Sequence, residues 1–304
     1  MKTIRRIGVD LGGTKIETVV LDEAGREAAR QRVATPAGDY DETVRRVVEA
    51  VTARAAEIEN EGAEARVGVC GPGSVSRETG LMRNANSTCL NGRPLVEDLQ
   101  TAIAAPLRFA NDADCFAVSE ATDGAGAGAS VVFGVIIGTG VGGGLVRDGV
   151  IQTGANGVSG EWGHAAAPRL AMGAESRACW CGRTDCVETW LSGPALGRTY
   201  REETGVDLTA AEFVAQGGAA ADRILDDYAS RLAAGLGMIA NIVDPDVFVL
   251  GGGLSNLPDL AATVEERLAP HVFSDHVSTK VKRARHGDSS GVRGAAQLWS
   301  ADGL

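Results

Sequence analysis

Basic residues are scarce in this sequence. Its 304 residues include 29 Lys and Arg against 40 Asp and Glu, a formal net charge of −11. A protein that neutralises the phosphates of a nucleic acid needs a basic excess, so this balance argues against a nucleic-acid binder. It does not exclude a nucleotide ligand, because small phosphates are held by backbone N–H groups, metal ions and one or two local cations.

Long apolar runs are also lacking. No stretch approaches the ~18 consecutive apolar residues of a membrane helix, and the initial MKTIRRIGVD has no apolar run behind its arginines that would suit a signal peptide. We therefore expect a cytoplasmic protein that does not contact membranes. In a reducing compartment its six cysteines are poor disulfide candidates, so clustering among them needs another explanation.

Strand and helix patterns alternate along the chain, which predicts the α/β class, and the length favours two domains. Segments 4–22 and 131–149 each show a β-rich run, a glycine-rich turn and a second β-rich run, the pattern of a hairpin. Their recurrence half a chain apart suggests internal duplication, with a domain junction at 123–128. Apolar spacing predicts helices over 41–61, 94–104, 113–121 and 222–243, and strands over 67–70, 107–110 and 247–250.

The first glycine turn is a candidate phosphate site. Gly12 and Gly13 follow an apolar strand, where the missing Cβ atoms let the main chain approach a phosphate, and Thr14 adds a hydroxyl group. Asp10 can hold a magnesium ion through water. A tight hairpin turn without any ligand explains this segment, taken alone, equally well.

The second glycine turn, 138–143, matches the dinucleotide-binding pattern, but that pattern requires a helix and residues 144–149 suit a returning strand. The His-Arg-Asp and Asp-Phe-Gly motifs of protein kinases are absent, as is the Gly-Lys pair of a Walker A loop. We therefore expect two opposed glycine turns that close on the phosphates of one nucleotide. The triplet 251–253 would let an adenine or ribose approach closely, although helix packing is the commoner use of such glycines.

Three cysteines close together in the sequence are the most specific chemical signal. Cys179, Cys181 and Cys186 suit tetrahedral zinc, and His164 is the nearest histidine that can complete the set. A saturated site of three cysteines and one histidine is structural and does not activate water. The alternative is three thiols without a metal. The isolated cysteines are expected to be small core residues: Cys70, Cys89 and Cys115.

Asp112 follows the predicted strand 107–110 and precedes a predicted helix, and ligands of open α/β sheets gather at the carboxyl ends of strands. Phosphoryl transfer needs a carboxylate that orients and deprotonates the attacking hydroxyl, which Asp112 can supply. The alternative is a helix N-cap, the commoner role of such an aspartate. Glu161, His164 and Glu188 form a suitable acceptor set for sugar hydroxyls, although each glutamate taken singly suggests a solvated surface acid.

Together these motifs resemble the ROK family of bacterial sugar kinases, repressors and related proteins. The resemblance implies an α/β fold of the actin-like or hexokinase-like (ribonuclease H-like) type, duplicated in two domains with a cleft between them, and often a homodimer. One departure is Asp185, where the family usually has glycine. The matching segments follow the family's order over nearly the whole chain: 10–15, 71–73, 111–113, 138–144, 161–164, 179–182, 186–188 and 244–253.

The resemblance also implies domains and ligands. The domains would be 1–122 and 123–290, the second carrying the zinc loop, with a helix over 291–302 returning to the first. ATP with Mg²⁺ and a hexose would bind, with Asp112 as general base and structural Zn²⁺ on His164, Cys179, Cys181 and Cys186. The implied sugar contacts are Gly71, Asn86, Asn111, Asp112, Glu161, His164 and Glu188. The implied ATP contacts are Asp10, Gly12, Gly13, Thr14, Lys15, Gly138, Thr139, Gly140, Gly142, Gly251, Gly252 and Gly253.

Segments 84–88, 90–92 and 286–296 look most like bacterial manno(fructo)kinases. They predict phosphorylation of fructose, with mannose as second choice, at the 6-hydroxyl. N-acetylglucosamine kinases share a similar C-terminal segment, so they and glucokinases remain alternatives. A repressor would need an N-terminal helix-turn-helix before the first strand at Ile4, a non-catalytic sugar-sensing regulator would be expected to lose Asp112, and a chaperone-like ATPase leaves the cysteine cluster unexplained.

Overall fold

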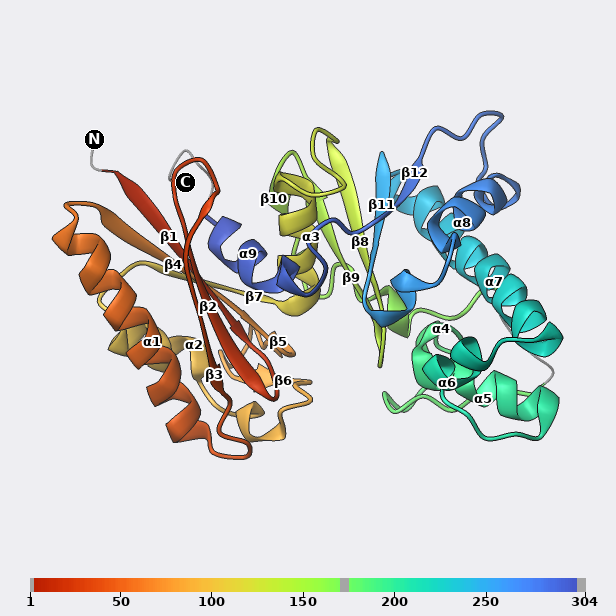
Figure 1. The fold of residues 1–304 in the computed structure, drawn as a ribbon, viewed down its shortest axis with the longest axis horizontal. Coiled ribbons are helices and arrows are strands. Elements are labelled where there is room, and N and C mark those ends of the chain that lie inside the picture. The colour runs from red at the N-terminus through yellow and green to blue at the C-terminus, as the bar shows by residue number, and fades with distance from the viewer. Residues whose placement is uncertain (1–2, 170–174, 300–304) are drawn as a thin grey trace. The chain divides into compact units, whose positions relative to one another are not determined.

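The computed structural model describes residues 3–169 and 175–299 of the chain. They form two compact units, each with its own hydrophobic core (Figure 1). The first unit comprises Met1–Thr122, Gly149–Val158 and Asp288–Leu304, and the second comprises Asp123–Asp148 and Ser159–Gly287. The domains expected from the sequence were 1–122 and 123–290; the first compact unit ends its first segment at Thr122 and also includes Gly149–Val158.

The first unit is built on a five-stranded sheet of order β3-β2-β1-β4-β7. Strands β1 to β3 are antiparallel neighbours, and β4 and β7 run parallel to β1. The strands are β1 Ile4–Leu11, β2 Lys15–Leu21, β3 Glu27–Ala34, β4 Glu64–Gly71 and β7 Leu107–Asn111, with a small ribbon of β5 Ser74–Val75 and β6 Met82–Arg83. The helices are α1 Tyr40–Asn60, α2 Leu95–Ala102, α3 Asp112–Thr122 and α9 Ser290–Gln297.

The second sheet repeats this plan, in the order β10-β9-β8-β11-β12. β8 and β9 form an antiparallel hairpin, and β11 and β12 run parallel to β8. Both predicted hairpins and the predicted duplication are therefore confirmed. The strands are β8 Val131–Ile137, β9 Val141–Arg147, β10 Val150–Ile151, β11 Val247–Gly251 and β12 Lys280–Arg283. The helices are α4 Glu188–Leu191, α5 Gly193–Thr204, α6 Ala210–Gln216, α7 Ala219–Val243 and α8 Leu260–Leu268.

Helix α7 shows how the apolar pattern sets the second core. Its residues Ile224, Tyr228, Leu232 and Leu236 recur at helical spacing and are all buried. Ile242 continues this spacing but is 80% exposed, although its neighbours Ala240 and Val243 in the same turn pack on the core.

Helix α9 lies directly on the sheet of the first unit. A Cβ atom on Gly8 of β1 would come within 2.1 Å of the Val292 carbonyl oxygen, and one on Gly68 of β4 within 1.7 Å of that of Ala295. Only glycine permits such close approach of helix and strand. The helix had been expected over 291–302, of which 300–302 lie outside the described residues.

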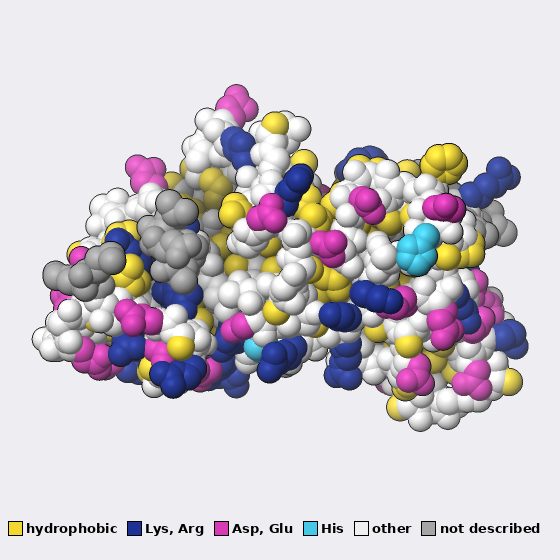
Figure 2. Space-filling model, turned by 90° about the horizontal axis from the view of Figure 1, so that it is seen from above, with side chains coloured by type: hydrophobic (Ala, Val, Ile, Leu, Met, Phe, Trp, Pro, Cys, Tyr) yellow, Lys and Arg dark blue, Asp and Glu magenta, His cyan; other side chains and the backbone are white. Residues whose placement is uncertain are grey.

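No helix in the described part of the chain is long and apolar enough to cross a membrane. On the face drawn in Figure 2, acidic and basic side chains are interspersed. The net negative charge is therefore not concentrated in one field on that face.

Candidate active site and metal centre

The pair Asn111 and Asp112 lies where β7 ends and α3 begins. The Asn111 side-chain oxygen accepts the backbone N–H of Asp114 at 2.6 Å, three residues on, which is the contact of a helix N-cap. The capping role considered for Asp112 therefore belongs to Asn111. Asp112 accepts the adjacent N–H of Ala113, at 2.9 Å, and remains accessible to solvent.

The acid–base properties of Asp112 suit a proton acceptor. The protein atoms around its carboxyl group displace enough water to raise its pKa above the ordinary value, even though the side chain stays accessible. Hydrogen bonding to the backbone opposes this shift. A raised pKa makes the carboxylate a stronger base.

Asp10, near the end of β1, lies within electrostatic reach of Asp112. Burial raises the pKa of Asp10 to about 6, a hydrogen bond from Cys70 opposes the shift, and the charges of Asp112 and Glu17 add to it. A Cβ atom on Gly291 of α9 would come within 2.9 Å of the Asp10 carboxylate. Two carboxylates this crowded favour a nearby cation, such as magnesium bound with a nucleotide.

The first glycine turn joins β1 to β2. The N–H of Gly12 donates to the Lys15 carbonyl at 3.0 Å, and Gly13 and Thr14 are exposed. The Lys15 amine lies 3.2 Å from Glu17, a buried carboxylate. Burial alone would raise the pKa of Glu17, but Lys15 and the arginines of β3 lower it overall. The turn therefore exposes its backbone beside the Lys15 amine, whose charge is paired with Glu17.

Two further predicted sugar contacts lie in the first unit, one at the end of a strand and one in a loop. Gly71 ends β4, where a Cβ atom would meet the Phe109 ring at 3.0 Å. Asn86 is exposed in a loop held by Asn91, whose amide accepts from and donates to the Ala85 backbone at 2.9 Å each way. The loop is thus fixed on one side while Asn86 remains accessible.

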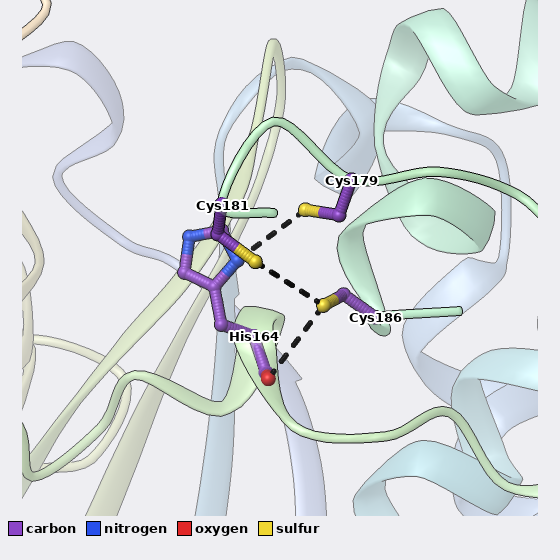
Figure 3. A group of neighbouring side chains, drawn as sticks. All are labelled: His164, Cys179, Cys181 and Cys186. Atoms are coloured by element: carbon purple, nitrogen blue, oxygen red, sulfur yellow. Dashed lines mark hydrogen bonds between the residues drawn. The ribbon is translucent and has the colours of Figure 1, made fainter. Parts of the chain in front are cut away.

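The predicted metal ligands come together in the second unit. The ligand atoms of His164, Cys179, Cys181 and Cys186 all lie within 4.8 Å of one another (Figure 3). Four ligands about 2.0–2.3 Å from one zinc ion stand at comparable separations. All four residues present nitrogen or sulfur, and the Cys181 and Cys186 sulfurs, 3.6 Å apart, are free thiols. The set therefore fits a tetrahedral zinc ion.

Close backbone packing positions His164. A Cβ atom on Gly163 would come within 2.0 Å of the Val141 carbonyl oxygen, and one on Gly160 within 2.2 Å of that of Gly143. The buried Trp162 donates its indole N–H to the Gly142 carbonyl at 2.8 Å. Part of the glycine content of 138–144 thus serves to seat the loop carrying Glu161 and His164 on β9.

Asp185 shows how this chain departs from the family's glycine without losing the turn. Its φ is +53°, a left-handed conformation that favours glycine and that aspartate tolerates better than most residues. Its carboxylate accepts the backbone N–H of Arg177 at 2.8 Å and the hydroxyl of Ser176. These contacts compensate for the backbone strain.

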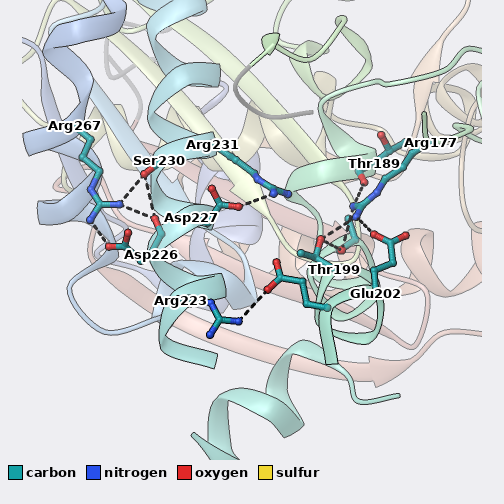
Figure 4. A network of polar contacts seen from close by, with 12 residues as sticks. Arg177, Thr189, Thr199, Glu202, Arg223, Asp226, Asp227, Ser230, Arg231 and Arg267 are labelled. Atoms are coloured by element: carbon teal, nitrogen blue, oxygen red, sulfur yellow. Dashed lines mark hydrogen bonds and ion pairs between the residues drawn. The ribbon is translucent and has the colours of Figure 1, made fainter. Parts of the chain in front are cut away.

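Arg177 was not anticipated from the sequence. Its buried guanidinium lies 3.8 Å from the centre of the Trp190 ring and donates to Thr189, Thr199 and Glu202 (Figure 4). A buried arginine is stable only when its donors are satisfied, as here. Residues 177–187, which include the three candidate cysteine ligands, are called the metal loop below. Arg177 links this loop to α4 and α5 through its contacts with Thr189, Thr199 and Glu202.

Glu188 connects the metal loop to the second glycine turn. One carboxylate oxygen accepts the N–H of Val141 at 2.9 Å, and the other accepts the indole N–H of Trp180 at 2.6 Å. A Cβ atom on Gly140 would lie 2.7 Å from the first oxygen, so a side chain there would displace the Glu188 carboxylate. Thr139, at the tip of the turn, is exposed.

A cavity of about 810 Å³ opens beside this turn. It brings Gly138 and Thr139 together with Gly253, as the nucleotide prediction requires, whereas Gly252 packs on the end of β8, with φ +81°. No sequence motif marks the other residues that line it, which include Gly193, Pro194, Gly197, Arg198, Arg201, Asp207 and Leu257. The size suits a small-molecule ligand.

Two sheets of identical strand order, each opened by a glycine hairpin, define a protein of the duplicated actin-like or hexokinase-like class. Among solved structures, the chain resembles a ROK hexokinase from Thermus thermophilus, with TM-score 0.83, 28% identity and 97% of each chain covered. It also resembles a ROK family glucokinase from Streptomyces griseus, solved with glucose and AMPPNP, with TM-score 0.72, 27% identity and coverage of 97% of this chain and 98% of that one.

Sequence comparisons agree. The chain is 39% identical to an N-acetyl-D-glucosamine kinase of Escherichia coli O127:H6 (strain E2348/69 / EPEC), covering 97% of this chain and 99% of that protein. The ROK family model matches residues 6–302. The chain therefore belongs to the ROK family.

Proposed function

We propose that this protein is an ATP-dependent hexose kinase that phosphorylates N-acetylglucosamine at its 6-hydroxyl. The observation that carries the proposal is the 39% identity, over nearly the whole chain, to an N-acetyl-D-glucosamine kinase. Fructose was the first expectation from segments 84–88 and 90–92, and the relatives found do not support it. The Asn111–Asp112 pair favours a catalyst over a non-catalytic regulator.

Asp112 is the proposed general base. It accepts the proton of the 6-hydroxyl as that oxygen bonds to the γ-phosphorus and the bond to the bridging oxygen breaks, leaving ADP. Its raised pKa and its freedom from helix capping support this role. The proposed sugar contacts are the seven residues named from the family resemblance, among them the exposed Asn86 and the metal ligand His164.

The proposed nucleotide contacts are the two glycine turns. In the second unit, the cavity lined by Gly138, Thr139 and Gly253 is the candidate nucleoside site. Mg²⁺ bound with ATP would neutralise charge on the phosphates, and Asp10 is placed to favour it. Zinc on His164, Cys179, Cys181 and Cys186 would hold together the two segments that carry Glu161 and Glu188. The enzyme is proposed to act as a cytoplasmic homodimer.

An assay that couples ADP release to product formation tests the proposal, with N-acetylglucosamine, glucose, mannose and fructose compared at matched concentrations. We expect the highest kcat/KM for N-acetylglucosamine, by about tenfold or more, since a site built for the acetamido group leaves polar groups unpaired with other sugars. No ADP release with any sugar would reject a hexose kinase. A preference for fructose would restore the first expectation.

A further inference from the structure

Trp180 is an exposed aromatic side chain held in one orientation. It is 70% exposed, whereas the other three tryptophans of the chain, Trp162, Trp190 and Trp299, are buried. Single exposed apolar residues are common on protein surfaces and need no explanation by themselves. Trp180 differs because several contacts fix its ring.

Two side-chain contacts and the chain itself restrain this ring. The indole N–H donates to Glu188 at 2.6 Å, and the ring packs edge-to-face on His164 with centroids 4.9 Å apart and planes at 82°. On either side along the chain stand two of the candidate metal ligands, Cys179 and Cys181. An exposed ring fixed in this way loses little conformational freedom on contacting a ligand.

The two partners of Trp180 are residues already proposed to contact the sugar. A sugar ring carries hydroxyl groups at its edge and C–H groups on its faces. Sites for such ligands combine a few polar groups with aromatic surface, and Glu188, His164 and Trp180 supply both, with Trp180 in contact with the other two. The remaining lone pairs of the Glu188 carboxylate can accept sugar hydroxyls, because each oxygen has one protein donor in these contacts.

We propose that Trp180 forms a wall of the sugar site, packing on the apolar face of the hexose and holding the Glu188 carboxylate in its binding orientation. This inference rests on the proposed function, and it adds a residue whose identity sets sugar affinity. Its indole N–H positions Glu188, and its exposed ring supplies contact area. The two contributions are separable by mutation.

Quenching of tryptophan fluorescence tests the contact without any turnover. Iodide or acrylamide reaches Trp180 preferentially, because the other three tryptophans are buried. In the intact, metal-loaded protein, N-acetylglucosamine is expected to shield Trp180 from the quencher. In the Trp180→Phe variant, the quenchable fraction of the tryptophan fluorescence is expected to disappear. Unchanged quenching at saturating sugar would overturn the inference.

Kinetics separate the two contributions. For Trp180→Ala we expect a rise in the sugar KM of about tenfold, and for Trp180→Phe, which keeps an aromatic ring, about threefold. The KM for ATP should stay within about twofold in both, and zinc content should be unchanged. Phe273→Ala, which removes a fully exposed ring from the same unit, is the matched control and should resemble the wild type.

The outcomes distinguish the inference from the proposed function. If the wild type phosphorylates no sugar but sugar still shields Trp180, the kinase assignment is rejected and the contact between Trp180 and the sugar is retained. If the wild type phosphorylates sugar, and Trp180→Ala with its full zinc content has unchanged sugar KM and kcat, the inference about Trp180 is rejected and the kinase assignment is retained. A parallel rise of the sugar and ATP KM values in Trp180→Ala would also reject it, since that indicates general loosening of the loop.

Discussion

The carboxylate of Glu188 accepts the backbone N–H of Val141, the first residue of β9, at 2.9 Å. The same side chain accepts the indole N–H of Trp180 through its other oxygen. One carboxylate therefore joins the turn proposed for phosphate to the loop proposed for metal and sugar.

Glu188→Gln is expected to weaken both sites. An amide has one acceptor oxygen, so one of its two donor partners would face an NH₂ group, at a cost of about 1–3 kcal/mol. We expect higher KM values for both sugar and ATP and a lower midpoint of thermal unfolding. Glu203→Gln, which alters an exposed carboxylate of the same unit, should change neither. An effect on the sugar KM alone would show that the two sites are not linked through this residue.

Asp112→Asn is expected to lower kcat by at least about 10²-fold, because the amide cannot accept the hydroxyl proton. Sugar affinity and unfolding temperature should change little, since Asn111 and not Asp112 caps α3. Asn111→Ala removes the N-cap of α3 and should therefore lower the free energy of unfolding by about 1 kcal/mol. Substantial turnover in Asp112→Asn would remove Asp112 from the base role.

Asp10→Asn is expected to stabilise the ligand-free protein while impairing catalysis. The pKa of Asp10 in the folded state is about 6, above its ordinary 3.8. Between these values the folded state binds a proton that the unfolded state does not, so stability falls as pH rises through this window. Above about pH 7 the ionised carboxylate costs about 3 kcal/mol of stability, which the neutral amide relieves.

Denaturant unfolding at about pH 7.5 and about pH 4 tests the Asp10 prediction, because the difference between variant and wild type should vanish at the lower pH. A variant less stable than the wild type at the higher pH would show that Asp10 contributes net favourable contacts.

Cys181→Ser is expected to lose zinc and stability together, because a structural metal contributes its binding free energy to folding. Metal analysis of protein purified without chelator, combined with thermal unfolding, measures both. Cys89→Ser, which changes an isolated thiol of the first unit, should retain the metal. Wild-type protein without zinc in such a preparation would reject the metal assignment.

Asp185→Gly and Asp185→Ala should differ, although both remove the hydrogen bonds to Ser176 and Arg177. Glycine adopts φ +53° without strain, whereas alanine does not. We expect the alanine variant to be less stable than the glycine variant by about 1 kcal/mol. Equal stability of the two would mean that the turn relaxes around the substitution.

Local patterns predicted most of the elements. Helices α1 and α3 and strands β4, β7 and β11 follow from apolar spacing, because side chains on one face of an element must share one environment. The spacing predicts burial wrongly at one position: Ile242 continues the apolar spacing of α7 but is exposed. The capping role of Asn111 was likewise missed, since N-cap and first helical residue are neighbours and spacing does not separate them.

By itself, the sequence determined the fold class, the duplicated hairpins and the four candidate metal ligands, because each is specified by the chemistry or spacing of residues close along the chain, His164 excepted. Tertiary structure alone decided which oxygen of the Glu188 carboxylate accepts from Trp180 and which residues line the cavity beside Gly138. It also decided which contacts stabilise Asp185 in its turn and which bury Arg177. The contacts of Trp180, Asp185 and Arg177 join residues 8 to 25 positions apart, and the cavity brings together segments still farther apart. Such contacts depend on three-dimensional distances that no repeating sequence pattern encodes.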